Sequence, residues 1–157
     1  MPLINEYPNL IVTRTFSKAF AGAGLRIGYM AGHAEVIGQI NKIKLPYNIN
    51  FFSEHVARTA LANRDELAEG ISLLIRERDA LVSFLSELPC TVYPSCANFI
   101  CIRTGRKQQL FDALLADGIL VRDVSSYPML ENCLRISVGT SGENELLRKS
   151  LRRFFGS

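Results

Sequence analysis

The spacing of apolar residues divides the chain into a strand-and-loop beginning, a helical middle and an alternating end. Residues 10–13 (LIVT) are a short apolar run, which predicts a strand buried in a sheet with both faces covered. A polar, glycine-rich segment follows, and residues 25–32 (LRIGYMAG) predict a second strand. Apolar positions within residues 33–44 recur at helical spacing, and Pro46 then breaks the pattern.

Helical periodicity dominates residues 54–88. Asn63, followed three residues later by Glu66, resembles a capping box, so we expect a helix to restart there. One stripe of this segment is apolar apart from a single arginine: Leu67, Ile71, Leu74, Arg78, Leu81, Leu85 and Leu88. A helix of this length suits a connection between two subdomains.

The last part of the chain predicts short elements that alternate between strand and helix. Four strands are expected, at residues 91–95, 97–104, 119–124 and 133–138. The helix between the second and third strands stops at Gly118. Thr140 and Glu143 form a capping box that opens a final helix through Phe155. This alternation predicts a small layered α/β unit.

Composition narrows the class of protein without identifying it. The 157 residues are 48% hydrophobic and 21% charged, which excludes a disordered tail or a fibre. The formal charge of +3 is too small to indicate nucleic-acid binding. The basic residues of the last helix are interpreted as a solvated face: Arg148, Lys149, Arg152 and Arg153. No run approaches the roughly 20 apolar residues of a membrane span, and the first residues do not resemble a secretory signal. We expect neither nucleic-acid nor membrane partners.

The cysteines do not indicate a metal site. Cys90, Cys96, Cys101 and Cys133 form no C-x-x-C pair and lie far in sequence from both histidines. No metal is therefore expected. Free thiols agree with a reducing, cytoplasmic location.

Residues 13–29 (TRTFSKAFAGAGLRIGY) carry the candidate chemistry. Lys18 follows a strand and has apolar neighbours in sequence, and desolvation of an ammonium group lowers its pKa. A neutral amine is a nucleophile that forms Schiff bases with aldehydes. Thr15 and Ser17 add hydroxyl groups, and Arg26 adds a planar guanidinium suited to phosphate oxygens.

The glycines of this segment match no nucleotide-binding motif. Gly22, Gly24 and Gly28 give G-x-G-x-x-x-G, which is one residue longer than the dinucleotide fingerprint. Lys18 precedes these glycines, whereas the lysine of a P-loop follows them. The glycines would let the backbone approach a ligand closely. A lone lysine on such a loop is more often a surface charge.

The segment resembles the lysine region of fold-type I pyridoxal-phosphate aminotransferases of class I/II. In that family a hydroxyl residue, a variable residue and Ser-Lys precede a glycine-rich turn to G-L-R-x-G. Here these motifs read T-F-S-K at residues 15–18 and G-L-R-I-G at residues 24–28. The resemblance implies that Lys18 forms a Schiff base with pyridoxal 5'-phosphate (PLP) and then shuttles a proton. It also implies that Thr15, Ser17 and Arg26 bind the cofactor phosphate.

The resemblance extends to the end of the chain. Residues 95–103 (SCANFICIR) and 118–140 (GILVRDVSSYPMLENCLRISVGT) are similar to the small domain of histidinol-phosphate aminotransferases. This similarity implies that Arg122 and Arg135 face the substrate, near its phosphate. In most of the superfamily, the arginine that matches Arg135 binds the substrate carboxylate. From the residues alone, Arg122 is also compatible with a surface ion pair to Asp123 or Glu131. Arg135 lies between apolar neighbours and needs an anionic partner.

The resemblance implies an α/β fold, the C-terminal part of a fold-type I PLP-dependent transferase. Residues 1–52 would be the end of the large domain, residues 53–88 connecting helices, and residues 89–157 the small domain. Family members carry further cofactor-binding residues before the lysine, including an Asp that keeps the cofactor ring nitrogen protonated. We therefore interpret the chain as a C-terminal portion that does not transaminate at a useful rate alone.

The function implied is amino-group transfer between histidinol phosphate, or a related small-molecule amino donor, and 2-oxoglutarate, a 2-oxo acid. The family implies a homodimer and a role in histidine biosynthesis. One alternative is a PLP-dependent decarboxylase of a phosphorylated amino acid such as threonine phosphate, which shares the lysine motif. Another is a non-enzymatic truncated remnant that serves as an interaction module.

Overall fold

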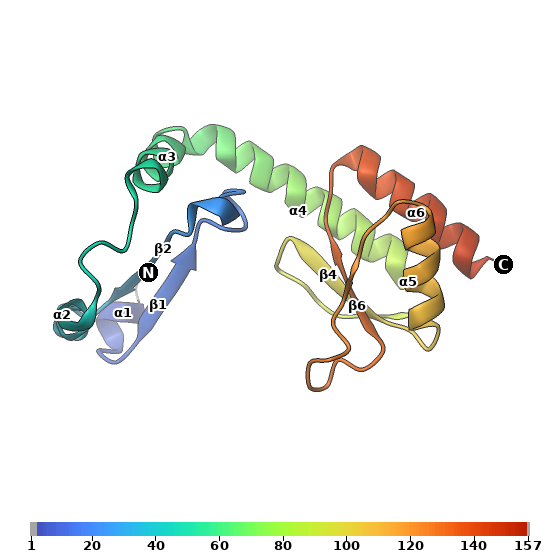
Figure 1. Cartoon of the computed structure of the whole chain (residues 1–157), viewed down its shortest axis with the longest axis horizontal. Helices are drawn as coiled ribbons and strands as arrows, with labels where there is room; N and C mark the ends of the chain where they lie inside the picture. The colour runs from blue at the N-terminus through green and yellow to red at the C-terminus, as the bar shows by residue number, and fades with distance from the viewer. Residues whose placement is uncertain (1–2, 157) are drawn as a thin grey trace. The chain divides into compact units, whose positions relative to one another are not determined.

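The chain folds into two compact units, Met1–Ala68 and Glu69–Ser157. The computed structural model describes residues 3–156, and Figure 1 traces their helices and strands in chain order. No helix in this described range combines the length and the apolar character needed to cross a membrane.

The first unit is built on a β-hairpin followed by helices. Its elements are α1 (Leu3–Glu6), β1 (Ile11–Thr15), the 3-10 turn η1 (Ala23–Leu25), β2 (Gly28–Gly32), α2 (Ala34–Ile43), α3 (Phe51–Ala62) and the start of α4 (Arg64–Ser86). β1 and β2 pair antiparallel from Ile11 opposite Gly32 to Thr15 opposite Gly28 (Figure 1). The hairpin therefore holds both ends of the loop at residues 16–27 side by side.

The predicted first strand is confirmed, but its predicted burial is wrong. Four of the five residues of β1 are exposed and the fifth is half-buried. Within the described residues, β1 belongs to a two-stranded sheet with β2 as its partner. An apolar strand stays exposed when no layers cover its two faces. The second strand begins at Gly28, later than predicted, because Leu25 belongs to η1.

The predicted break in the helical middle is confirmed between Ala62 and Arg64. α3 begins at Phe51, earlier than predicted, because the side chain of Asn50 accepts a hydrogen bond from the Ser53 amide at 2.9 Å. The predicted cap at Asn63 takes another form. Its side-chain amide donates to the Thr59 carbonyl oxygen at 2.9 Å and so closes α3. All seven positions of the predicted stripe are buried or half-buried.

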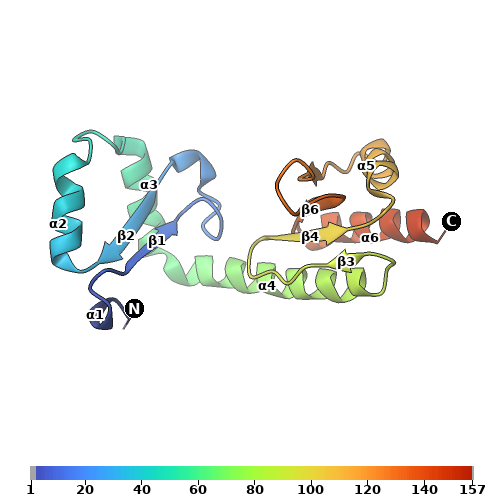
Figure 2. The same ribbon diagram turned by 90° about the horizontal axis from the view of Figure 1, so that it is seen from below.

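The second unit is an antiparallel sheet with helices packed on one face. Its strands follow the order β3 (Thr91–Val92), β4 (Phe99–Arg103), β6 (Cys133–Ser137), β5 (Arg122–Asp123), and Figure 2 shows β3 beside β4. The helices are α5 (Lys107–Ala116), α6 (Ser141–Phe155) and the second part of α4. Side chains from all of these helices and from both long strands form one core: Leu81, Leu85, Ile100, Ile102, Leu110, Leu114, Leu134 and Leu151.

Core residues alternate with outward-facing residues along β4 and β6. Ile100 and Ile102 face the helices, so Phe99, Cys101 and Arg103 lie on the opposite face of the sheet. We call this second surface the arginine face, because register also places Arg135 and Arg122 on it. The fold thus presents the predicted substrate arginines away from its core.

The predicted helix ends in this unit are confirmed. Gly118 has φ +75° and closes α5, with hydrogen bonds from its own amide to the Leu115 carbonyl and from Ile119 to Leu114. Thr140 and Glu143 form the predicted capping box of α6. Two predicted strands are shorter than expected. β3 is two residues long and is soon followed by Pro94, which has no N–H for a ladder, and β5 also has only two residues.

Candidate functional site

The predicted site residues form two sets, one in each unit. Thr15, Ser17, Lys18 and Arg26 lie on or beside the loop that joins β1 to β2. Arg122 and Arg135 lie on β5 and β6. The structure describes the geometry of each set within its own unit.

The loop at residues 16–27 is folded onto itself by backbone hydrogen bonds. Phe16 donates to the carbonyl of Ile27 at 3.1 Å, and Gly22 donates to the carbonyl of Phe16 at 2.9 Å. The Phe16 ring is 5% exposed and contacts the ring of Phe20, with 4.9 Å between the centroids. These contacts fix the loop from its apolar side and leave its polar side chains outward.

The two predicted hydroxyl residues are in direct contact. Thr15 Oγ1 donates to Ser17 Oγ at 2.9 Å, and the Ser17 amide donates back to Thr15 Oγ1 at 3.0 Å. Thr15 Oγ1 also lies 3.4 Å from the carbonyl oxygen of Ile27, the residue that follows Arg26. The end of β1 and the start of β2 thus bring both hydroxyls to the part of the loop that carries Arg26.

Arg26 adopts a left-handed backbone conformation with φ +54°. This conformation is uncommon for a residue with a long side chain, and such strain gathers at functional sites. Its Nη1 donates to the Ala23 carbonyl at 3.0 Å, while the side chain as a whole is exposed. The guanidinium is therefore anchored at one nitrogen and open to solvent.

Lys18 is exposed, so the predicted apolar enclosure of its amine is wrong for the described residues. The physical reason is that its apolar neighbours Phe16 and Phe20 pack on each other. The open position leaves the Lys18 amine accessible to an aldehyde from solvent.

Two of the three loop glycines serve the fold of the loop. A Cβ at Gly22 would lie 2.9 Å from the carbonyl oxygen of Phe16, and one at Gly28 would lie 2.7 Å from that of Arg14. Gly22 and Gly28 are therefore needed for close approaches of the chain's own backbone, and the expectation that the glycines also let the backbone approach a ligand stays a prediction. A Cβ at Gly24 would meet nothing within 4 Å.

The predicted substrate arginines lie directly opposite each other in the β5–β6 ladder. Both line a surface cavity of about 400 Å³, to which Ser137 also contributes. The Arg135 guanidinium lies over the Phe99 ring, 5.1 Å from its centroid. Arg135 Nε is buried and has no hydrogen-bond partner within the described residues. A buried donor of this kind is costly unless an acceptor reaches it, which favours an anion at this place.

The alternative interpretation of Arg122, an ion pair with Asp123 or Glu131, is wrong, because within the described residues the ion pair of Asp123 is with Lys107 and Glu131 forms none with Arg122. Asp123 Oδ2 lies 2.6 Å from Lys107 Nζ, and Asp123 Oδ1 accepts a hydrogen bond from the Ser125 amide at 2.9 Å. The hydrogen bonds from Lys107 and Ser125 lower the pKa of Asp123 to about 2. Both carboxylate oxygens of Asp123 are therefore occupied. Nothing in the sequence indicated this pair, because Lys107 lies on α5 and Asp123 on β5, 16 residues apart, and only the packing of the two elements brings them together.

Arg103 is a further cation of the arginine face that sequence analysis missed. Its Nη2 donates to the Met129 carbonyl at 2.7 Å, and its guanidinium lies 5.6 Å from the centroid of the Tyr93 ring. Between the arginines lie two thiols, and burial together with the neighbouring Cys133 raises the pKa of Cys101. Arg103 tethers the loop between β5 and β6 to β4.

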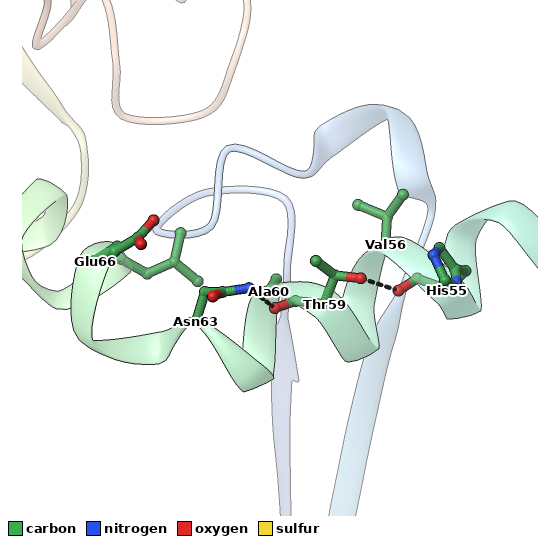
Figure 3. Close-up of a pocket in the computed structure, with 7 residues that line it drawn as sticks. His55, Val56, Thr59, Ala60, Asn63 and Glu66 are labelled. Carbon is green, nitrogen blue, oxygen red and sulfur yellow. Dashed lines mark hydrogen bonds between the residues drawn. The ribbon is translucent and has the colours of Figure 1, made fainter.

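A cavity of about 640 Å³ in the first unit contains none of the predicted site residues. It is lined by α3 and the start of α4 (Figure 3). Thr59 and Asn63, two of its polar side chains, donate to backbone carbonyls of α3 itself. The hydrogen bonds of these two side chains therefore serve α3 itself.

The basic residues of α6 make contacts within the second unit. Arg148 lies 3.6 Å from Glu145, Arg153 pairs with Asp117, and the Arg152 guanidinium lies 5.0 Å from the centroid of the Phe84 ring. These contacts agree with the interpretation of α6 as an ordinary surface helix.

Known proteins match almost the whole chain. The family described as aminotransferase class I and II matches residues 1–154. The histidinol-phosphate aminotransferase of Cytophaga hutchinsonii is 40% identical over 156 residues, which are 98% of this chain and 45% of the relative. That of Flavobacterium psychrophilum is 44% identical over 147 residues, 92% of this chain and 42% of the relative. The chain therefore spans less than half the length of these curated relatives.

Solved structures share its fold. The crystal structure of histidinol-phosphate aminotransferase from Sinorhizobium meliloti in complex with pyridoxal-5'-phosphate matches with a TM-score of 0.81 and 29% identity, over 95% of this chain and 42% of that one. The L-threonine-O-3-phosphate decarboxylase from Porphyromonas gingivalis matches with a TM-score of 0.83 and 26% identity, over 98% of this chain and 49% of that one. Each structure is about twice as long as the part that matches.

Proposed function

The chain belongs to the class I and II aminotransferase family, and on this premise we propose that it carries the cofactor lysine and substrate arginines of a PLP-dependent aminotransferase. The proposed reaction moves an amino group between histidinol phosphate and 2-oxoglutarate. The names of the two curated relatives support this substrate. Because the chain covers 45% and 42% of those relatives, the activity is proposed for a whole enzyme of that length. We expect the 157-residue chain alone to be inactive.

One observation carries the cofactor proposal: a single loop gathers two touching hydroxyls, an exposed amine and an exposed guanidinium. The hydroxyls of Thr15 and Ser17 lie 2.9 Å apart at the end of β1. Hydroxyl and guanidinium groups are donors suited to phosphate oxygens, and a primary amine is the group that condenses with an aldehyde. PLP contains both a phosphate and an aldehyde, so the donor set of this loop fits it.

When bound, PLP supplies an aldehyde for amines and a ring that accepts electrons from the substrate carbon. Thr15, Ser17 and Arg26 would hold the phosphate through charge-assisted hydrogen bonds. Lys18 Nζ would hold the cofactor covalently and then move the proton that leaves the amino-bearing carbon of the substrate. The hydrogen bond from Arg26 Nη1 to the Ala23 carbonyl would hold this guanidinium while its other nitrogens bind the phosphate.

Arg122 and Arg135 would bind the anionic end of the substrate. Two guanidiniums on adjacent strands suit a phosphate, whose oxygens accept bidentate hydrogen bonds. The unpartnered Nε of Arg135 supports an acceptor at this position. The phosphate of histidinol phosphate has this chemistry.

A related decarboxylase of a phosphorylated amino acid is the second candidate. The similarity to the Porphyromonas gingivalis enzyme favours it, with a TM-score of 0.83. Both reactions would use the same lysine and the same arginines. Release of carbon dioxide from threonine phosphate, without any 2-oxo acid, would distinguish the decarboxylase.

We further propose a homodimer, a cytoplasmic location and a role in histidine biosynthesis.

The substrate site is tested by titrating histidinol phosphate into the chain and following its ³¹P NMR line. We expect Arg135→Gln to abolish most of the line broadening, because the phosphate loses a guanidinium. Arg148→Gln is the matched control, since Arg148 is an arginine that lies on α6 and contacts Glu145. Equal broadening by the native chain and by Arg135→Gln would contradict the proposed site. In a parallel assay with PLP and 2-oxoglutarate, robust formation of glutamate would contradict the expected inactivity.

A further inference from the structure

The cavity that contains Arg122 and Arg135 also contains a carboxylate, that of Asp123. A free carboxylate at this place would attract the neighbouring guanidiniums and repel an incoming phosphate. Arg122 precedes Asp123 in sequence and lies directly opposite Arg135 in the β5–β6 ladder. Like charges opposite each other destabilise such a ladder. An ion pair between Arg122 and Asp123 would relieve that repulsion, yet the structure does not form it.

Strand alternation turns Asp123 away from Arg122. Asp123 lies opposite the core residue Leu134 and faces α5, where its carboxylate binds Lys107. Lys107 is the first residue of α5, and its Nζ lies 2.6 Å from Asp123 Oδ2. The lysine side chain is 15% exposed, so it is held against the protein, whereas that of Asp123 is 42% exposed. The Ser125 amide occupies the other carboxylate oxygen at 2.9 Å. Asp123 is therefore neutralised on the side away from Arg122.

We propose that Lys107 neutralises Asp123 and thereby keeps the cavity of Arg122 and Arg135 positively charged for the substrate phosphate. This inference rests on the proposed function, in which Arg122 and Arg135 bind that phosphate. It assigns Lys107 and Asp123 a role in specificity for anions, although neither would touch the substrate. The cavity keeps a net positive charge because its one carboxylate is already paired with a cation from α5.

A simpler role for the ion pair is to tether α5 to the short strand β5. The two roles predict opposite results for a pair of substitutions. If the pair is a tether, Lys107→Met and Asp123→Asn each weaken phosphate binding, and the double variant is no better. If Lys107 neutralises Asp123, Lys107→Met alone weakens binding, and adding Asp123→Asn restores it because the unpaired carboxylate is gone.

The experiment titrates inorganic phosphate into the full chain at low ionic strength and measures affinity by calorimetry. We expect Lys107→Met to weaken binding about tenfold, Asp123→Asn to stay within about twofold, and the double variant to return to the native affinity. Lys107→Arg keeps the charge and should also stay within about twofold. Asp117→Asn is the matched control, because Asp117 pairs with Arg153 elsewhere in the same unit.

Hydrogen exchange of residues 119–137 shows whether β5 is kept in each variant. If β5 loses its protection in Lys107→Met, phosphate binding by Asp123→Asn becomes the test. A tenfold loss of phosphate affinity in Asp123→Asn would then overturn the inference. Phosphate binding that depends on Arg135 but not on Lys107 would overturn the inference and leave the proposed function intact. Phosphate binding that Arg135→Gln does not change would overturn both.

Discussion

The two units of the chain differ in how completely each buries its own apolar side chains. In the second unit, Leu81, Ile100 and Leu134 are completely buried. In the first unit, Ile43 is 84% exposed and Tyr47 is 96% exposed. The arginine face therefore belongs to a sheet whose other face is buried against helices of the same unit. The lysine loop belongs to a hairpin whose residues remain largely exposed. Exposed apolar surface of this kind is where other protein surfaces bind.

This difference separates the two sets of residues that are proposed to be functional. The arginines are fixed by strand register, which sets the positions of Arg122 and Arg135 opposite each other. The lysine loop is fixed by local hydrogen bonds, such as that between Phe16 and Ile27. We expect the positions of Arg122 and Arg135 to change less than that of the lysine loop when the chain is substituted or partly unfolded.

A matched pair of leucine substitutions gives the largest expected effect on this comparison. Leu85→Ala removes a completely buried side chain from the core and should lower the free energy of unfolding of the second unit by about 2 to 5 kcal/mol. Leu45→Ala removes a side chain that is 74% exposed and should change stability by less than about 0.5 kcal/mol. Urea unfolding with hydrogen exchange of each unit measures both. Equal losses from the two variants would refute the contrast in burial.

A matched pair of glycine substitutions tests the hairpin of the first unit. Gly28→Ala would place its Cβ 2.7 Å from the Arg14 carbonyl, so the β1–β2 ladder should weaken by about 1 to 3 kcal/mol. Gly24→Ala meets nothing within 4 Å and should leave the ladder intact. Hydrogen exchange of the β1 and β2 amides reports the difference. Loss of protection in both variants would mean that the loop, and not the close approach at Gly28, holds the hairpin.

Acid should lower the stability of the second unit, by less than the two pairs of substitutions above. Its interactions lower the pKa of Glu77, Asp117, Asp123 and Glu143, mainly through hydrogen bonds from Ser141, Ser150, Lys107 and the Thr140 amide respectively. A lowered pKa contributes stability that is complete above the unfolded values of 3.8 to 4.5 and is lost as the pH falls through the folded values.

We therefore expect the urea midpoint of the second unit to fall between about pH 5 and about pH 2. Lys107→Met should reduce this acid-sensitive part, because it removes the largest cause of the lowered pKa of Asp123. A midpoint that stays constant over this pH range would contradict these assignments.

The sequence predicted best those features that depend on local chemistry. The capping box of Thr140 and Glu143, the stop at Gly118 and the break near Asn63 all follow from side-chain groups close in sequence. The predicted burial of β1 failed, because burial depends on partner layers that no local pattern describes. In the same way the apolar neighbours of Lys18 in sequence did not enclose its amine.

The predicted site was incomplete where contacts join distant segments. The motif named Arg122 and Arg135 but gave no sign of the Lys107–Asp123 pair, whose members are separated by 16 residues. It also missed Arg103, which reaches the Met129 carbonyl across the sheet edge. Register and helix placement decide such contacts, and both come from the packed structure.

The most direct test of the account is the site at which PLP attaches to the chain. The chain is incubated with substoichiometric PLP, reduced with borohydride and mapped by peptide mass spectrometry. We predict one dominant adduct on Lys18, lost in Lys18→Arg and reduced in Arg26→Gln, whose phosphate contact is gone. Lys42 and Lys44, which are also exposed, serve as internal controls. Labelling of these lysines equal to that of Lys18 would contradict the central claim that this loop is built to bind the cofactor.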